Sequence, residues 1–152
     1  MSAFGLDIAE SCVCIFDAKT SKEEALDRLI DAVYQTGFVK DLEALRKATH
    51  ERETSMSTGI GGGIAIPHVR MDGIRQAVAG VGISSAGIEF AAVDHNPVHI
   101  IVFFAMPADA NKVYLGLLAQ LMVALKDADF RERLIACRTP AEVIAILNES
   151  GG

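Results

Sequence analysis

The sequence predicts an α/β fold, with one central mixed β-sheet flanked by helices on both faces, in a single domain spanning residues 1–152. Three observations support this prediction. Of the 152 residues, 51% are hydrophobic, enough to fill a substantial core. Residues 98–105, Val-His-Ile-Ile-Val-Phe-Phe-Ala, form a nearly continuous apolar run that is typical of a central strand covered on both faces. Strand and helix patterns also interleave along the chain, without an internal repeat or linker.

Other segments are predicted to be extended. Residues 12–16, Cys-Val-Cys-Ile-Phe, form a strand candidate, and residues 64–66 form a short buried one. The glycines within residues 77–83 indicate a strand that packs closely against a neighbour. Residues 84–87 are predicted to turn the chain, and residues 88–93 form a short extended piece at an edge.

Capping residues predict the helices. Ser21 and Glu24 form a capping box at the start of the first helix, and Gly37 ends it. Asp41 caps the second helix. The later helices are expected to begin near Asn111, to span residues 127–137, and to begin at Thr139, where Thr-Pro-Ala-Glu is another capping box.

Charge and cysteine content exclude several classes of function. The formal net charge is −6 at pH 7, so no basic excess exists for general binding of nucleic acid or an anionic membrane. Residues 1–7 lack the basic start of a signal peptide, and the apolar run 98–106 is too short for membrane insertion. The three cysteines are odd in number and indicate reduced thiols. A cytoplasmic protein is therefore predicted.

The stretch Thr58-Gly-Ile-Gly-Gly-Gly-Ile-Ala-Ile-Pro-His68 contains the strongest functional signal. Its glycines indicate unusual backbone conformations or a close approach of backbone to another group, and successive free amides form anion-binding concavities. Pro67 then ends a rigid strand and is followed by His68. Histidine acts as a nucleophile near neutral pH, so the pattern predicts phosphate chemistry on His68. The alternative is an ordinary loop histidine, and the glycine spacing fits neither a dinucleotide fingerprint nor a P-loop.

Residues 50–68 resemble the active-site signature of the enzyme IIA domains of the bacterial phosphotransferase system, in the fructose/mannitol class that includes the nitrogen-regulatory branch. The resemblance covers nearly the whole chain, and it implies a mixed sheet flanked by helices. The matching segments are residues 21–26, Arg52-Glu53, Ser57-Thr58-Gly59, Gly61, residues 64–68, residues 94–98, the strand to Pro107, and residues 115–121.

The resemblance implies that His68 is the phosphoryl acceptor. Acceptance requires a neutral ring nitrogen, an in-line approach and stabilised equatorial oxygens. The family has an arginine near the phosphohistidine, which implies that Arg52 contacts the phosphoryl group through its guanidinium. The alternative for Arg52 is an exposed residue at a helix end. Glu53 is predicted to order Arg52 or to cap the loop rather than to accept protons.

The residues between Arg52 and His68 are predicted to support the phosphoryl group. The amides after Thr58, including those of Gly59 and Gly61, are expected to stabilise its oxygens. The hydroxyls of Ser57 and Thr58 add donors, unless they only cap a turn.

One position departs from the family. Many members have a second histidine beside the phosphorylated one, in a His-Leu pair that opens the helix after Pro107, whereas this chain has Tyr114-Leu115. A tyrosine donates a hydrogen bond but, with a pKa of about 10, carries no positive charge near neutral pH. Tyr114 therefore either supports the phosphoryl group or His68, or packs over the site.

The leading functional prediction is a phosphotransferase with a phosphohistidine intermediate. His68 accepts a phosphoryl group from the phosphocarrier protein HPr, or its nitrogen-branch relative, and passes it to an enzyme IIB or holds it as a regulatory state. The alternative is a non-catalytic regulatory interaction protein, whose phosphorylation state switches its binding to a transporter, kinase or sensor. His50, His95, His99 and the Cys12-Val-Cys14 pair fit no metal signature, so no metal and no cofactor is predicted. No pattern assigns a sugar or an oligomeric state.

Overall fold

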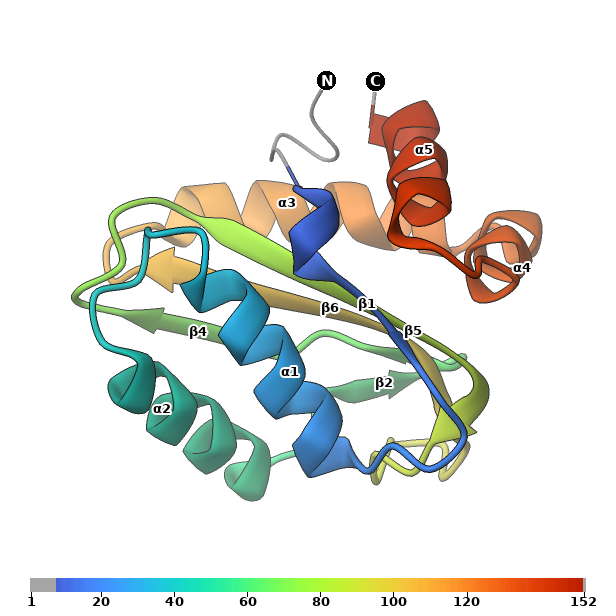
Figure 1. Ribbon diagram of the computed structural model, residues 1–152, viewed down its shortest axis with the longest axis horizontal. Coiled ribbons are helices and arrows are strands. Elements are labelled where there is room, and N and C mark those ends of the chain that lie inside the picture. The colour runs from blue at the N-terminus through green and yellow to red at the C-terminus, as the bar shows by residue number, and fades with distance from the viewer. Residues whose placement is uncertain (1–7, 152) are drawn as a thin grey trace.

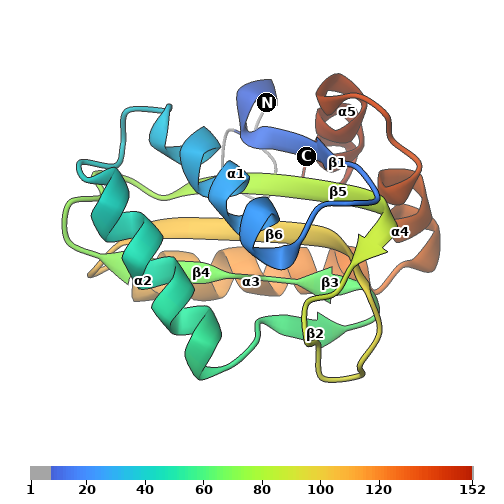
Figure 2. The same cartoon turned by 60° about the horizontal axis from the view of Figure 1, so that its bottom comes forward.

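The computed structural model describes residues 8–151, apart from the side chains of residues 111, 113, 114 and 150. The described residues form a six-stranded mixed sheet (Figures 1 and 2). Its strands are β1 (Val13–Phe16), β2 (Gly59–Gly61), β3 (Ile64–Ala65), β4 (His68–Met71), β5 (Val78–Ile88) and β6 (Val98–Pro107). The strand order is β1-β5-β6-β3-β2, and β4 also pairs with β6. The pairs β5–β6 and β2–β3 are antiparallel, whereas β1–β5, β3–β6 and β4–β6 are parallel.

Helices cover both faces of this sheet. α1 (Lys22–Tyr34) and α2 (Leu42–Ser55) lie on one face, whereas α3 (Asn111–Leu125), α4 (Ala128–Ile135) and α5 (Pro140–Gly151) lie on the other (Figure 1). A 3₁₀ turn, η1 (Glu10–Cys12), precedes β1. The buried hydrophobic side chains form two clusters, one on each face. The predicted α/β fold, with helices on both faces of a mixed sheet, is therefore confirmed.

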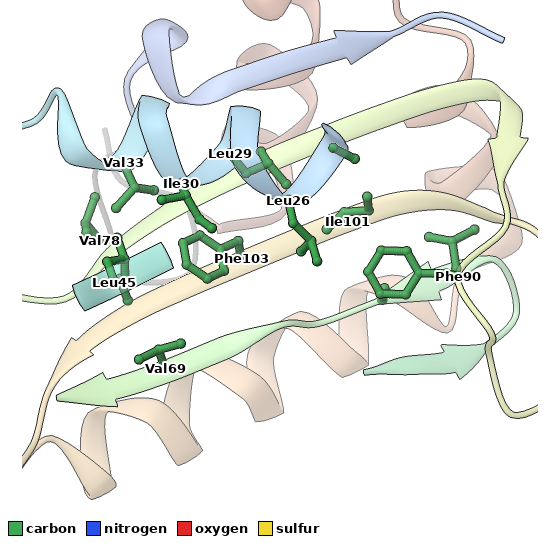
Figure 3. Close-up of a cluster of buried hydrophobic side chains, with 14 of the residues drawn as sticks. Leu26, Leu29, Ile30, Val33, Leu45, Val69, Val78, Phe90, Ile101 and Phe103 are labelled. Atoms are coloured by element: carbon green, nitrogen blue, oxygen red, sulfur yellow. The ribbon is translucent and has the colours of Figure 1, made fainter. Parts of the chain in front are cut away.

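β6 is the central strand that its apolar sequence predicts. Its side chains alternate between the two clusters, since Ile100, Val102 and Phe104 pack toward α3, whereas Ile101 and Phe103 pack toward α1. Figure 3 shows the second set beneath the apolar face of α1. Both faces of β6 are thus covered, which explains why its sequence lacks the polar alternation of a half-exposed strand.

Side-chain caps begin three of the helices where the sequence predicts them. Ser21 Oγ accepts the N–H of Glu24 at 3.1 Å, and Asp41 accepts an N–H of the first turn of α2 at 3.1 Å. Thr139 Oγ1 accepts the N–H of Glu142 at 3.2 Å. The cap at Asp41 matters for function, because it fixes the start of the helix that crosses over β4 (Figure 2).

The predicted turn at residues 84–87 is wrong, because β5 continues through these residues to Ile88. The register with β6 shifts between Ile83 and Ile88, so an irregular segment of strand takes the place of the turn. The predicted extended piece at residues 88–93 is also wrong beyond Ile88, since residues 89–93 belong to no strand.

The glycine-rich stretch is a β-hairpin rather than an open loop. β2 pairs with β3, with Gly59 opposite Ala65. The turn is made by Gly61, Gly62 and Gly63, whose φ angles are 94°, 67° and 80°. L side chains rarely adopt such angles, so these glycines serve the turn geometry.

The predicted strand end at Pro67 is confirmed, since β3 ends at Ala65 and residues 66 and 67 belong to no strand, but the sequence did not predict that a new strand begins at His68. Because Pro67 has no N–H, it interrupts the ladder, and pairing with β6 resumes at once in β4. The carbonyl of Pro67 accepts the N–H of Phe104 at 3.0 Å, and His68 lies opposite Phe104. His68 therefore stands within the sheet, at the start of its own strand.

Candidate functional site

His68 is half-buried at the first position of β4. Its Nδ1 lies 3.0 Å from the carbonyl oxygen of Ile66. Because a carbonyl oxygen only accepts hydrogen bonds, Nδ1 carries the proton of the neutral ring, and the lone pair lies on Nε2. One hydrogen bond thus sets both the tautomer and the orientation of the imidazole.

His68 lines an open cavity of about 390 Å³. The other lining residues come from α2, from β4 and from the segment after β6: Ala48, Arg52, Val69, Arg70 and Ala108. His68 and Arg70 are two residues apart on a strand and therefore share one side of it. No carboxylate occurs among these lining residues, so the two arginines give the cavity positive charge in a chain whose net charge is −6. Such a cavity suits an anion.

The two arginines of the cavity, Arg52 and Arg70, differ in their hydrogen bonds. Arg52 lies in the last turn of α2, where its Nη1 donates to the carbonyl of Met56 at 3.1 Å. A positive charge is favourable at that end of a helix. Arg70 is exposed, and within the described residues it has no hydrogen bond or ion pair. Sequence reasoning missed Arg70, and the signal that would have found it is its two-residue spacing from His68 once residues 68–71 are read as a strand.

Glu53 is buried, with 8% of its surface exposed. Its carboxylate accepts hydrogen bonds from the N–H of Thr58 at 3.1 Å and from the Thr58 hydroxyl, and it pairs with Nζ of Lys22 at 2.7 Å. Within the described residues no hydrogen bond or ion pair joins Glu53 to Arg52. These contacts agree with the loop-capping alternative, since they join the end of α2 to the start of β2.

Ser57 and Gly59 are bonded to each other and to the loop before β6. Ser57 Oγ donates to the carbonyl of Phe90 at 2.8 Å and accepts the N–H of Gly59 at 3.1 Å. A Cβ on Gly59 would lie 2.7 Å from the Cβ of Ala92, so only glycine allows this approach. The hydroxyls of Ser57 and Thr58 thus have internal partners, as in the turn-capping alternative. Their contacts with a phosphoryl group stay predictions.

The structure does not bring Gly61 to His68. Gly61 lies opposite Ile64 at the hairpin turn, and Ile64 precedes His68 by about 13 Å of extended chain. The N–H of the neighbouring Gly62 donates to Oδ2 of Asp94 at 3.1 Å. The turn therefore binds a carboxylate of the same chain, and the role predicted for the Gly61 amide is not supported by this placement.

Tyr114 belongs to the first turn of α3, a helix that begins three residues after Ala108 of the cavity. Ala110 stands at the N-cap and offers no side-chain cap, so the first N–H groups of α3 are left for other acceptors. The side chain of Tyr114 lies outside the described residues, and its predicted role stays a prediction.

Residues 8–150 match the protein-family model described as "Phosphoenolpyruvate-dependent sugar phosphotransferase system, EIIA 2". The chain belongs to this family. It is therefore a phosphotransfer component of the phosphotransferase system, and the resemblance seen in residues 50–68 is confirmed. In the part of this EIIA chain that the structure describes, no helix has both the length and the apolar character needed to cross a membrane.

Known proteins resemble this EIIA chain over most of its length. It is 31% identical over 137 residues to the fructose-specific EIIA component of Haloferax volcanii, covering 90% of this chain and 89% of that protein. It is 30% identical over 128 residues to the fructose-specific EIIABC component of Bacillus subtilis, covering 84% of this chain but only 20% of that longer protein.

Solved structures of EIIA proteins share the fold. The nitrogen regulatory protein IIA-Ntr of Neisseria meningitidis superposes with a TM-score of 0.82 at 27% identity, covering 92% of this chain and 95% of that one. The mannitol enzyme IIA of Escherichia coli, solved in complex with phosphorylated enzyme IIB, superposes with a TM-score of 0.76 at 19% identity, covering 93% and 97%.

Proposed function

We propose that this EIIA chain is a phosphohistidine carrier, in which Nε2 of His68 accepts a phosphoryl group from an HPr-like phosphocarrier. The observation that supports this most directly is the 3.0 Å hydrogen bond between Nδ1 of His68 and the carbonyl of Ile66. It leaves the lone pair on Nε2, and a neutral nitrogen with a lone pair is the nucleophile that acceptance requires. The cavity shared with Arg52 and Arg70 supplies the matching positive charge.

The transfer step follows from these groups. The lone pair of Nε2 attacks phosphorus, so that an N–P bond forms while the bond from phosphorus to the donor breaks and its electron pair leaves with the donor. Arg52 and Arg70 stabilise the equatorial oxygens, on which the charge is spread. The Nδ1–H bond to the Ile66 carbonyl persists after transfer and stabilises the positive charge that phosphorylation places on the ring.

Two settings for this chemistry have support. The E. coli enzyme IIA that shares the fold was solved with phosphorylated enzyme IIB, which supports an enzyme IIB as the onward acceptor. The likeness to a nitrogen regulatory IIA-Ntr favours a second function, in which the phosphorylated chain switches its binding to a target protein. Both settings are cytoplasmic, and this location stays a prediction.

The test is incubation of the full chain with phosphoenolpyruvate, enzyme I and HPr, followed by peptide mapping with mass spectrometry. We expect one acid-labile, base-stable phosphoryl group on the peptide that contains His68. Phosphate on a different residue, or none, would contradict the proposal. Adding an enzyme IIB then separates the settings, because a carrier loses its phosphoryl group to IIB whereas a regulatory protein keeps it.

A further inference from the structure

We propose that a partly buried ion pair between Lys22 and Glu53 positions His68 and Arg52 for phosphoryl transfer, an inference that rests on the function proposed for His68. Lys22 opens α1, Glu53 lies in the last turn of α2, and these two helix ends lie side by side (Figure 1). Nζ and Oε2 are 2.7 Å apart, and the side chains are only 18% and 5% exposed. Because water and salt screen such a pair weakly, it couples the two helix ends strongly.

Both charges stand where the helix dipole disfavours them. Lys22 is the first residue of α1, at the end with partial positive charge, and Glu53 is near the end of α2 with partial negative charge. The helix dipoles therefore do not favour either charge. The charge of each residue is instead compensated by the opposite charge of the other, across the contact between α1 and α2. Residues that break a local rule and are compensated elsewhere are expected at functional sites.

A continuous path of hydrogen bonds leads from this pair to the imidazole. Glu53 accepts the N–H of Thr58 at 3.1 Å, and the carbonyl of Thr58 accepts the N–H of Ile66 at 3.0 Å. The carbonyl of Ile66 in turn accepts the Nδ1–H of His68 at 3.0 Å. Each hydrogen bond on the path restrains the residue that makes the next one. A shift of Glu53 would therefore displace the Ile66 carbonyl, which sets the tautomer of His68.

A second link reaches Arg52. Nζ of Lys22 also donates to the carbonyl of Phe90 at 3.2 Å and lies 4.4 Å from the centroid of its ring. Ser57 donates to the same carbonyl at 2.8 Å, so the segment between α2 and β2 is held from both sides. Because Glu53 directly follows Arg52, holding Glu53 also holds the turn of α2 that presents Arg52 to the cavity.

The experiment compares Lys22→Met and Glu53→Gln with the parent chain and with the conservative variant Lys22→Arg. Nitrogen-15 NMR of the His68 ring, recorded before any phosphorylation, measures the share of the Nδ1–H tautomer. The rate of phosphorylation by phosphorylated HPr is measured in parallel. We expect a reduced share of that tautomer and a rate lower by about 10- to 100-fold, the scale of a small misplacement of reacting groups. Lys22→Arg is expected to keep both values near those of the parent.

Lys47→Met is the matched control, because Lys47 also pairs with a glutamate of α2, at 3.9 Å, but this pair is exposed. We expect no change in that variant. If Lys22→Met does not fold, Lys22→Met/Glu53→Gln removes both charges while leaving an amide oxygen for Thr58, and a smaller shift in the same direction is expected. An unchanged tautomer and an unchanged rate in folded Lys22→Met, in Glu53→Gln or in the double variant would overturn the proposal. A parent chain that is never phosphorylated would instead overturn the function proposed for His68, while the ring measurement still decides the positioning role.

Discussion

The two ends of the segment that runs from the β2–β3 turn to β4 have opposite surroundings. At the hairpin end, the N–H of Gly62 is bound by Asp94, and the carbonyl of Gly63 accepts two N–H groups from the start of β6, at 2.8 and 3.0 Å. At the other end, His68 opens onto a cavity with two arginines. The hairpin end is thus closed by internal bonds beside a carboxylate, whereas the histidine end is open and cationic.

This difference shows that closeness in sequence is not closeness in space when the chain is extended. The glycines and the histidine belong to one signature, yet about 13 Å of strand separates Ile64 from His68. The glycines allow a tight turn and a close approach to the loop before β6, and the chemistry is left to the far end. Substitutions at the histidine end should therefore change phosphoryl transfer, whereas those at the hairpin end should change stability.

Replacing the acceptor should have the largest effect. We expect His68→Ala to abolish acid-labile phosphorylation while the circular dichroism spectrum stays native, because the half-buried ring contributes little to the core. The matched control is His95→Ala, an exposed histidine in the turn near the hairpin, which should be phosphorylated at the parent rate. Equal phosphorylation of His68→Ala and the parent would remove the chemical distinction between the two ends.

The two arginines of the cavity should come next. A hydrogen bond from a charged group contributes about 1.5–3 kcal/mol, so Arg52→Ala and Arg70→Ala are each expected to slow transfer by roughly 10- to 100-fold. Melting temperatures should change little, because neither guanidinium is buried. Arg75→Ala is the control, since this exposed arginine donates to the carbonyl of Gly37 at 3.0 Å, outside the cavity. Stopped-flow transfer rates in which Arg70→Ala equals Arg75→Ala would make Arg70 a surface residue only.

Tyr114 is expected to have a smaller effect on transfer. If its hydroxyl donates one neutral hydrogen bond of about 1 kcal/mol, Tyr114→Phe slows phosphorylation by roughly tenfold or less. Tyr114→His should keep or improve acceptance and add a pH dependence near the imidazole pKa of about 6.5. Phosphorylation rates measured against pH for the three proteins test this. A loss of about a thousandfold in Tyr114→Phe, some 4 kcal/mol, would show that the hydroxyl is essential.

The features that were predictable from the sequence depend on local signals. The caps at Ser21, Asp41 and Thr139 lie within a few residues of the groups they bind, so they could be predicted without knowledge of the fold. The apolar run of β6 likewise contains its own evidence of burial on both faces. β2 and β4 were missed because strands of three and four residues have almost no periodicity, and their pairing with distant strands decides their conformation.

The candidate site likewise has residues that the sequence predicted and residues that it did not. The pattern of residues 58–68 predicted His68, the resemblance added Arg52, and the structure brings both to one cavity. Arg70 was missed because its relevance depends on β4 being a strand. The pairing of Lys22 with Glu53 was missed because it joins two helices far apart in the chain, and the signs of both charges argue against their own helix ends. Contacts of this kind follow from the packing of α1 against α2 and have no signature in a single segment.

At the hairpin end, the expected effects concern stability and not transfer. Gly63 has φ of +80°, and an added Cβ would lie 3.3 Å from Cδ2 of His99. Gly63→Ala should therefore cost about 1–2 kcal/mol in the free energy of unfolding, as measured with urea. The transfer rate per folded molecule should match that of the parent. A large loss of transfer without loss of stability would mean that the glycines take part in phosphate binding after all.

The smallest effect is expected at Asp94, and it depends on pH. Hydrogen bonds from the N–H groups of Asn96 and then Gly62 hold the pKa of the Asp94 carboxyl below its usual range. A group with a lowered pKa in the folded state adds stability above its unfolded pKa, about 3.9 for aspartate, and that stability is lost as the pH falls through the folded value. Asp94→Asn keeps an acceptor oxygen for Gly62 but removes the charge. It should therefore be slightly less stable than the parent near neutral pH.

Urea unfolding across a series of pH values tests this expectation, and the difference in stability between parent and Asp94→Asn should shrink below about pH 4. A difference that does not vary with pH would show that the charge of Asp94 contributes nothing to the hairpin. The same variant also tests the contrast between the two ends of the segment. Since Asp94 binds the turn and not the cavity, phosphoryl transfer to His68 in Asp94→Asn should equal that of the parent. A clear loss of transfer would show that the hairpin and the histidine act as one site.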